Sequence, residues 1–441
     1  MDRNAAPKVH IVTLGCSKNT VDSEVLAGQL RAHHLDVAHT IEDADSLVIN
    51  TCGFIDAAKE ESINTILEAV ELKRQGALRQ VVVAGCLSER YGDELRIEIP
   101  EVDHYFGTEA YEGIIKAISP NLKYSLMGER IVSTPTGYAY LKISEGCDRP
   151  CSFCAIPLMR GKHRSVAADE VVRQAQTLVA QGARELVLVA QDLTYYGLDI
   201  HGKRTLADLL RRLSDESGAD WIRCMYAFPS GFPLDVLDVI SERSNIVSYL
   251  DMPLQHASDA VLKSMRRGIT RERTEALLAT IRDRIPDITL RSTFIIGYPN
   301  ETEHDVDELL SFLDTVQLDR VGVFPYSQED DTYAYILGDP IPDSVKQGRI
   351  ERVMELQRSI SESKNLAKIG STVEVLIEED VLHHDGAAVE WRGRSSADAP
   401  EVDNDVYVRS ELPLQIGSIV HVQIDDAAEF DLFGTVATTK E

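Results

Sequence analysis

The sequence predicts an α/β protein of three successive units, and three observations lead to this fold class. Between Lys8 and about residue 127, short apolar runs alternate with helix-length amphipathic stretches, which is the pattern of a small parallel α/β domain. From Tyr138 the alternation repeats six times on a larger scale and predicts a full or partial parallel (βα) barrel. After Gly370, β-rich runs follow one another without helical spacers, as in a small antiparallel, OB-like β-barrel.

The 441 residues are enough for about three domains of ordinary size, and we predict their limits as 7–127, 133–369 and 370–441. The segments between strands of the first two units are long enough for crossover helices, so both sheets are expected to be parallel. The expected strands are 8–14, 46–50 and 80–84 in the first unit, and 138–143, 185–190, 221–227, 247–251, 289–296 and 320–325 in the second. The expected helices of the second unit include 168–181, 303–316 and 343–368, and the expected strands of the third unit are 372–377, 406–408 and 419–424.

Negative charge dominates the sequence and is concentrated in its last unit. The chain has 72 Asp and Glu against 45 Lys and Arg, a net charge of −27, and residues 371–441 alone hold 16 acidic and 4 basic residues. Such a surface repels phosphate backbones and attracts basic partners. We therefore expect a basic protein, and not a nucleic acid, as the direct partner.

The sequence carries no recognisable targeting or membrane-spanning segment. The first apolar run is short and ends at Gly15, and no later segment reaches the roughly 18 uninterrupted apolar residues of a membrane span. We therefore expect a cytoplasmic protein without membrane association. In that reducing compartment, cysteines at short spacings are more often metal ligands or catalytic thiols than disulfides.

Three of the seven cysteines, Cys16, Cys52 and Cys86, each follow the end of an expected strand in the first unit. In an open parallel sheet the carboxyl ends of the strands lie on one edge, where ligands usually bind, so the three thiols can converge there. The alternative is that they are buried apolar side chains, because free cysteine often packs as a small hydrophobe. Cys224 lies inside a strand pattern and is predicted to be a core thiol.

The strongest motif is Cys147-Asp148-Arg149-Pro150-Cys151-Ser152-Phe153-Cys154, in the loop after the first strand of the second unit. Thiolates are the usual iron–sulfur ligands, and three in one loop can hold three corners of a four-iron cluster and leave one iron open for reaction. A zinc site and a structural turn are the alternatives. Structural zinc requires four closed ligands, and the nearest further candidate, His163, lies nine residues after Cys154.

This Cys-x3-Cys-x2-Cys loop, with an aromatic residue before its last cysteine, resembles that of the radical S-adenosylmethionine (SAM) enzymes. The segments Leu14–Asn19, Asn50–Ile55 and Ala84–Leu87 further resemble those of the methylthiotransferases. The resemblance implies a radical SAM core in the second unit, a TRAM domain as the terminal barrel, and two [4Fe-4S] clusters as cofactors. It assigns the cluster that cleaves S-adenosyl-L-methionine to Cys147, Cys151 and Cys154, and a second cluster, which binds or supplies sulfur, to Cys16, Cys52 and Cys86.

The segments Ala139–Cys147, Leu250–Ser258 and Ser396–Glu401 resemble the methylthiotransferase branch that modifies an aspartate of ribosomal protein S-twelve. This resemblance implies hydrogen abstraction from the aspartate β-carbon, insertion of a methylthio group there, two SAM molecules, and an external electron donor such as flavodoxin or ferredoxin. The acidic terminal barrel would dock the basic ribosomal protein. The alternatives are a transfer-RNA adenosine methylthiotransferase and a non-enzymatic, metal-binding module associated with the ribosome.

Six further residues are candidates for SAM contacts: Phe153, Gln191, Asp192, Gln255, Gly297 and Glu301. Phe153 is the aromatic residue of the cysteine loop. Gln191, Asp192 and Gln255 follow strand ends, where polar side chains can meet the methionine or ribose groups, although such residues also serve as caps and turns. Gly297 and Glu301 belong to a segment that resembles the one passing the adenosine in this superfamily, and a glycine at a strand end permits close backbone approach.

Overall fold

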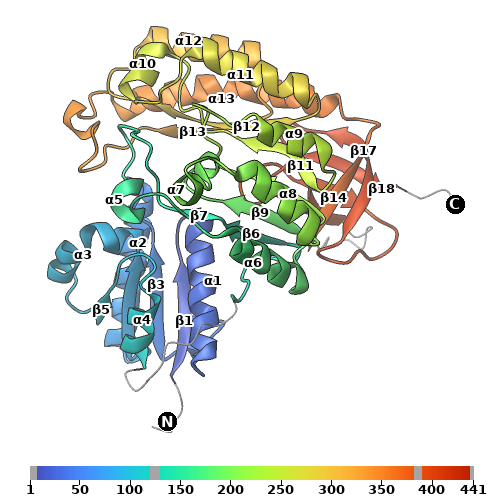
Figure 1. Cartoon of the computed structure of the whole chain (residues 1–441). Helices are drawn as coiled ribbons and strands as arrows, with labels where there is room; N and C mark the ends of the chain where they lie inside the picture. Colours follow the sequence, from blue (N-terminus) through green and yellow to red (C-terminus); the bar gives the residue numbers. More distant parts are fainter. Residues whose placement is uncertain (1–6, 120–129, 382–389, 438–441) are drawn as a thin grey trace.

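The computed structural model describes residues 7–119, 130–381 and 390–437, so the predicted domain limit at residue 127 lies outside the described residues. The N-terminal domain holds a five-stranded sheet in the order β2-β1-β3-β4-β5, in which every strand pair is parallel (Figure 1). Its elements are β1 (Lys8–Thr13), α1 (Ser17–Ala32), β2 (Asp36–Val37), β3 (Ser46–Thr51), α2 (Asp56–Arg74), β4 (Gln80–Gly85), α3 (Cys86–Glu98), β5 (His104–Tyr105) and α4 (Tyr111–Ile118).

Apolar residues on both faces of this sheet explain why helices cover it on both sides. All six residues of β3 are buried, as expected for a central strand of a parallel sheet. Leu47 faces α2 and α3, whereas Val48 faces α1 and α4. The three predicted strands are confirmed, and β2 and β5 are additional short strands at the sheet edges.

The central domain is an open parallel sheet of six strands in the order β13-β12-β11-β10-β9-β6, so the predicted barrel is a partial one (Figure 1). Its strands are β6 (Tyr138–Lys142), β9 (Glu185–Val189), β10 (Trp221–Cys224), β11 (Ile246–Asp251), β12 (Thr289–Ile296) and β13 (Arg320–Pro325). Its helices are α5 (Ile156–Arg160), α6 (Ala168–Ala180), α7 (Leu198–His201), α8 (Leu206–Glu216), α9 (Asp235–Glu242), α10 (Asp259–Ser264), α11 (Arg271–Arg284), α12 (Glu303–Val316) and α13 (Asp343–Leu366). No helix in the described ranges is both long and apolar enough to cross a lipid bilayer.

Two local features of the central domain matter for the site. A short antiparallel pair, β7 (Ser144–Glu145) with β8 (Arg164–Ser165), lies beside the sheet and brackets the cysteine loop. Strand β10 ends at Cys224 and not at residue 227, because Tyr226 adopts a left-handed conformation with φ of 63° that an extended strand cannot include. Cys224 itself is a core thiol, as predicted, with 2% exposure.

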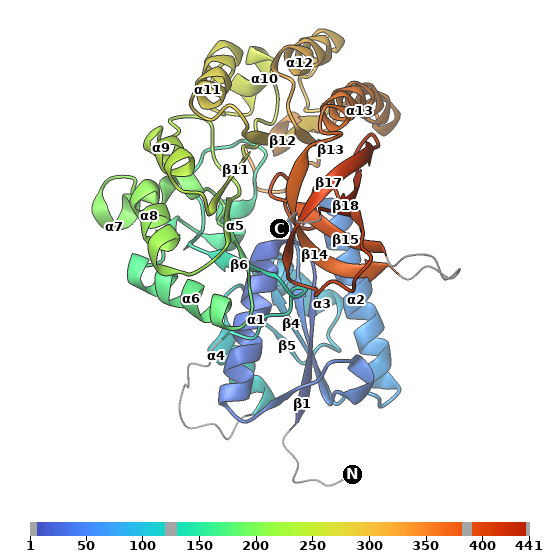
Figure 2. The ribbon, with the colours of Figure 1, turned by 90° about the vertical axis from the view of Figure 1, so that its right-hand side faces the viewer.

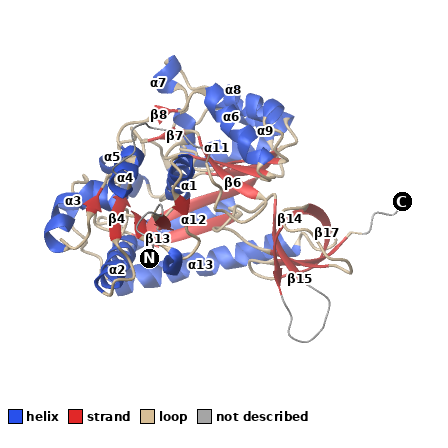
Figure 3. Cartoon of the chain, turned by 90° about the horizontal axis from the view of Figure 1, so that it is seen from below, coloured by secondary structure: helices blue, strands red, loops and turns tan. Residues whose placement is uncertain are grey.

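The C-terminal domain is a closed barrel of five strands in the order β14-β15-β16-β18-β17. Its strands are β14 (Thr372–Val381), β15 (Glu390–Ser395), β16 (Val406–Arg409), β17 (Ile419–Ala427) and β18 (Leu432–Val436). The barrel is antiparallel except for the pair β16 and β18, which is parallel. Sequence patterns predicted three of these strands, and β15 and β18 were not among them. Figure 3 shows the barrel beyond the end of α13.

Alternating side chains give the central sheet an outer face toward its helices and an inner, concave face. Leu188 packs outward, whereas Val187 and Tyr249 point inward. The inner side chains pack against Val21 of α1 and against Ala399 of the C-terminal barrel. Both flanking domains therefore cover the concave face of the open sheet, from two sides (Figure 2).

The segment Ser396–Glu401, which resembles that of the methylthiotransferases, is part of this contact. Asp398 pairs with Arg320 at the start of β13 (2.6 Å between Oδ1 and Nη2), and the nearby Arg394 pairs with Glu185 at the start of β9 (2.8 Å). Farther along, Asp403 accepts a hydrogen bond from the Tyr249 hydroxyl (2.6 Å). The two ion pairs fasten the barrel to the amino-terminal ends of β13 and β9, at the edge opposite the cysteine loop, and the hydrogen bond adds a contact within β11.

Candidate functional site

The loop between β7 and α5 holds Cys147, Cys151 and Cys154 in a fixed turn. The Cys147 N–H donates to the carbonyl of Gly161 (3.0 Å), and the Cys154 N–H donates to that of Cys151 (3.3 Å). Ser152, between them, is anchored by its N–H to the Met265 carbonyl (3.0 Å). Burial raises the pKa of the Cys147 thiol to about 11 and also raises that of Cys154. We call these three residues the loop triad.

Two arginines donate hydrogen bonds to the sulfur atoms of the loop triad. The backbone N–H of Arg149 lies 3.4 Å from Cys147 Sγ, and Nη1 of Arg267 lies 3.2 Å from Cys151 Sγ. The guanidinium of Arg149 is sandwiched between the rings of Tyr195 and Phe228, 3.8 Å from each centroid. Donors and positive charge next to sulfur favour the thiolate form, which is the form that binds metal. The loop triad therefore fits an anionic iron–sulfur cluster.

Cys16, Cys52 and Cys86 lie at the carboxyl ends of β1, β3 and β4, three adjacent strands, as the sequence predicted. Cys16 is exposed and precedes the first turn of α1, whereas Cys52 and Cys86 are buried. Gly15 has a φ of +90°, and a Cβ there would lie 2.8 Å from Cys52 Sγ, so only glycine allows this close approach. Burial raises the pKa of Cys86 to about 12, and the adjacent Cys16 and Cys52 add to that effect. We call these residues the strand-end triad.

Helix α5 connects the two triads, because it begins just after Cys154, and Met159 of the helix packs on Cys86 together with Ala155, the residue before the helix. Its last residue, Arg160, pairs with Asp22 of α1 (2.6 Å between Nη1 and Oδ2).

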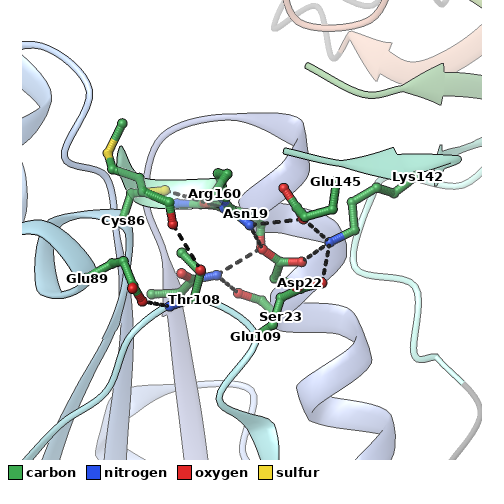
Figure 4. Close-up of polar contacts among 12 residues, drawn as sticks. Asn19, Asp22, Ser23, Cys86, Glu89, Thr108, Glu109, Lys142, Glu145 and Arg160 are labelled. Carbon is green, nitrogen blue, oxygen red and sulfur yellow. Dashed lines mark hydrogen bonds and ion pairs between the residues drawn. The ribbon is translucent and has the colours of Figure 1, made fainter. Parts of the chain in front are cut away.

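Figure 4 shows the ion-pair cluster that surrounds Arg160. Lys142 pairs with both Asp22 and Glu145 at 2.6 Å, and Arg160 also donates to Asn19 Oδ1, which lies 3.8 Å from Cys86 Sγ. The charges that join the N-terminal and central domains thus lie beside Cys86 of the strand-end triad and include Glu145, which is two residues before Cys147 of the loop triad.

Two of the predicted SAM contacts have free polar atoms. The carbonyl oxygens Oε1 of Gln191 and Gln255 are buried without a hydrogen-bond partner among the described residues. Gln255 also has a left-handed backbone, with φ of 76°. Buried polar atoms are normally satisfied, so both amides suit a bound polar ligand at the carboxyl edge of the sheet.

The other predicted contacts are engaged within the protein. Asp192 accepts from the Arg149 Nε (2.7 Å) and caps the short 3₁₀ turn after β9. Glu301 accepts from the N–H of Gly297 (3.0 Å) and pairs with Arg349 (2.8 Å). Phe153 packs into an apolar cluster beneath the loop. Asp192 and Glu301 therefore hold neighbouring groups in place, and each of their carboxylate oxygens has a hydrogen-bond partner.

Sequence reasoning did not single out Arg149, Arg160, Arg267 or Lys18. Arg149 lies inside the cysteine motif and Arg160 shortly after it, so proximity in sequence was an available signal for those two. Arg267 reaches Cys151 across 116 positions of chain, and no local pattern indicates such a contact.

The zinc alternative depended on His163, whose Nε2 lies 3.1 Å from the Ser165 hydroxyl. Across residues 7–119, 130–381 and 390–437, no three His, Cys, Asp or Glu side chains converge on a position for a single metal ion. A four-iron cluster makes no such demand, because each cysteine binds a different iron.

Comparison with protein families divides the chain as the fold does. The model of the uncharacterized protein family UPF0004 matches residues 8–107, that of the radical SAM superfamily matches residues 141–313, and that of the TRAM domain matches residues 369–437.

Curated relatives match over almost the whole length. The "Ribosomal protein uS12 methylthiotransferase RimO" of Cytophaga hutchinsonii is 52% identical over 436 residues, covering 98% of both chains. The protein of the same name from Christiangramia forsetii is 50% identical, covering 97% of this chain and 94% of the relative. The chain belongs to the RimO family of methylthiotransferases. It is therefore an enzyme of the radical SAM superfamily that transfers sulfur-containing groups.

Solved structures show the same fold for this RimO-family chain at low sequence identity. The radical SAM methyltransferase TsrM from Kitasatospora setae, with cobalamin and a [4Fe-4S] cluster bound, aligns with a TM-score of 0.57 and 14% identity over 75% of this chain and 77% of its own. The cobalamin-dependent radical SAM enzyme OxsB aligns with a TM-score of 0.52 and 16% identity over 78% and 56%. At these identities the likeness concerns the fold alone.

Proposed function

We propose that this methylthiotransferase inserts a methylthio group at the β-carbon of an aspartate in ribosomal protein uS12, using two molecules of SAM. The names of the relatives support the substrate, and the division of six cysteines into two adjacent triads supports the chemistry. When bound, the two clusters and SAM would supply a 5′-deoxyadenosyl radical for hydrogen abstraction and a methylated sulfur for the new C–S bond.

The loop triad, Cys147, Cys151 and Cys154, is proposed to hold the [4Fe-4S] cluster at which SAM binds. The arginine donors to Cys147 and Cys151 support this role. The strand-end triad, Cys16, Cys52 and Cys86, is proposed to hold a second [4Fe-4S] cluster for sulfur delivery. Its place at the edge of a parallel sheet, beside α5, supports transfer between neighbouring sites.

For SAM we propose direct contacts from the free amide oxygens of Gln191 and Gln255. Gly297, whose N–H is bonded to Glu301 and whose Cα packs against the Lys346 side chain, would shape the backbone beside the cofactor. Asp192 and Glu301 would not touch SAM themselves but would hold Arg149 and the Gly297 N–H in position. Phe153 would keep the cysteine loop seated on its apolar cluster.

We further propose that the chain is organised as 7–127, 133–369 and 370–441, and that the last of these domains docks the basic ribosomal protein. Several of its acidic side chains, such as Asp398 and Asp403, are buried against arginines of the central domain and are not available for docking. The exposed acidic residues Glu374, Glu379, Asp380, Asp425, Asp426 and Glu429 face solvent, and a basic partner could bind them. Glu379, Asp425 and Glu429 also form exposed ion pairs with Arg392, Arg409 and Arg358, which such a partner would compete with. An external electron donor, such as flavodoxin or ferredoxin, would reduce the loop-triad cluster.

The test is a substrate competition. The enzyme is reconstituted anaerobically with iron and sulfide, then incubated with SAM, a reductant, purified uS12 and unmodified transfer RNA, and both products are analysed by mass spectrometry. We expect one methylthio group on a uS12 aspartate and none on the nucleosides. Methylthio-adenosine with unchanged uS12 would reject the proposed substrate.

A further inference from the structure

Lys18, in the first turn of α1 and two residues after Cys16, is a buried lysine with only 8% exposure. Its Nζ lies 3.1 Å from the centroid of the Tyr226 ring. Within the described part of the chain it has no hydrogen bond or ion pair through Nζ, although buried lysines are almost always paired. Its ammonium group therefore has donors free for a ligand.

The other buried cations near the triads are paired. Lys142 and Arg160 share Asp22, Arg149 pairs with Asp192, and Arg267 donates to Cys151 and to a backbone carbonyl. Lys18 differs from these four because its counterpart is an aromatic face. A ring attracts a cation without neutralising its charge, so the positive charge stays available to an incoming anion.

The position of Tyr226 places this cation where the two domains meet. Tyr226 follows β10 at the carboxyl edge of the central sheet, and its N–H donates to Asp251 Oδ2 (2.9 Å). Its carbonyl accepts from the Leu193 N–H (3.1 Å), so the residue is fixed in its left-handed conformation. Lys18 belongs to the helix that begins at the strand-end triad. The ammonium group thus lies between that triad and the sheet edge that carries Gln191 and Gln255.

We propose that Lys18 binds the side-chain carboxylate of the substrate aspartate, with the Tyr226 ring as its support. The inference rests on the proposed function, in which the reacting β-carbon is bonded directly to that carboxylate carbon. An ammonium–carboxylate contact would therefore fix the reacting carbon relative to both triads, and would discriminate against a neutral adenine base. Lys18 is then a specificity-determining residue whose ligand is a carboxylate.

The experiment measures binding by the reconstituted holoenzyme, in the presence of SAM and without reductant, so that no turnover occurs. The ligands are uS12 and uS12 in which the target aspartate is replaced by asparagine. Removing a charge-assisted hydrogen bond in Lys18→Met should raise the Kd for uS12 about ten- to a hundredfold. The same enzyme variant should bind the asparagine form as the unmodified enzyme does, because the charge on the ligand is already gone. Lys18→Arg should recover part of the affinity.

Lys116→Met is the matched control, since it removes one positive charge from an exposed ion pair with Glu112 on α4 of the same domain. It should leave the affinities for the aspartate and asparagine forms of uS12 unchanged. Iron content, sulfide content and SAM affinity of Lys18→Met should equal those of the unmodified enzyme, and Lys18→Gln serves if the methionine variant does not fold. Equal loss of affinity for the aspartate and asparagine forms would overturn the inference. Loss of SAM affinity instead would assign the cation to the methionine carboxylate and would also overturn it. If the unmodified enzyme neither binds nor modifies uS12, the proposed function fails and this inference with it.

Discussion

Each of the two triads consists of three cysteine thiols, but the chain brings these thiols together in opposite ways. The loop triad comes from eight consecutive residues, and its geometry depends on one turn that is braced by Gly161 and Met265. The strand-end triad is collected from three strands, and its geometry depends on a whole sheet and on the glycine at position 15. The first is set locally and the second by tertiary structure. In this fold the cysteines proposed for the radical cluster can thus be supplied by a single loop, whereas those proposed for the sulfur cluster come together only when the N-terminal domain is complete.

Their surroundings differ as well. The loop triad receives donors from two arginines, Arg149 and Arg267, and faces the open carboxyl edge of the central sheet. The strand-end triad is close to Arg160 through Asn19, and this arginine is neutralised by Asp22. This difference in charge around the sulfur atoms would give the two proposed clusters different reduction potentials, because charge and hydrogen bonds to sulfur set the reduction potential of a cluster.

The largest expected effect comes from removing one triad at a time. Cys154→Ala should abolish both 5′-deoxyadenosine release and methylthiolation, because the loop triad is proposed to hold the cluster at which SAM is cleaved. Cys86→Ala should retain reductive SAM cleavage and lose methylthiolation of uS12. Each variant should lose about half of the iron. Chromatography of deoxyadenosine and mass spectrometry of uS12 measure the two activities.

Cys224→Ala is the control for these variants, since that thiol is buried in the core of the central domain, away from both triads. It should retain both activities and the full iron content. If Cys86→Ala and Cys154→Ala lost the same activities, the two triads would not have separate tasks.

A smaller effect is expected at the ion pair that joins the triads. Arg160→Met leaves Lys142 as the only cation paired with the buried Asp22 and Glu145 among the described residues, and breaking a buried pair in this way costs about 3 kcal/mol of unfolding free energy. Urea denaturation followed by circular dichroism measures this loss. Arg164→Met, which breaks an exposed pair with Glu109, should cost less than about 1 kcal/mol. Equal costs for the two variants would show that Lys142 is sufficient to neutralise the cluster.

These contrasts explain how much of the site was predictable from sequence. The loop triad and the strand-end triad were both predicted, because cysteines at strand ends and in one short loop have recognisable spacings. The partners of Arg160 and Arg267 were not, because they come from remote parts of the chain that only the fold brings together. Strand Glu390–Ser395 was missed because its polar and arginine-rich sequence does not alternate, although Arg394 is buried in an ion pair.

The reactivity of the thiols toward an alkylating agent gives a further contrast between buried and exposed cysteines. In the cluster-free protein, burial holds the pKa of Cys147 at about 11 and that of Cys86 at about 12. Only the thiolate reacts, so at pH 8 Cys147 should be alkylated about 100-fold more slowly than an unperturbed cysteine, and its rate should rise about tenfold per pH unit until the pH approaches 11. The exposed Cys16 should react first. Peptide mass spectrometry after iodoacetamide treatment gives each rate, and a pH-independent rate at Cys147 would contradict the raised pKa.

The smallest expected effect concerns the charge beside the loop triad. Arg267 donates to Cys151 Sγ, and a positive donor at sulfur stabilises the reduced, more negative cluster. Replacing Arg267 by Met should therefore lower the reduction potential of the loop-triad cluster by about 60 mV, a tenfold change for one electron, and leave the second cluster unchanged. Potentiometric titration followed by electron paramagnetic resonance separates the two clusters. Arg266→Met removes the adjacent charge, which lies over the Tyr333 ring and touches no sulfur, and should shift the potential less. If both variants shifted it equally, long-range charge and not the contact with Cys151 would set the potential, and the difference in charge between the two triads would lose its functional meaning.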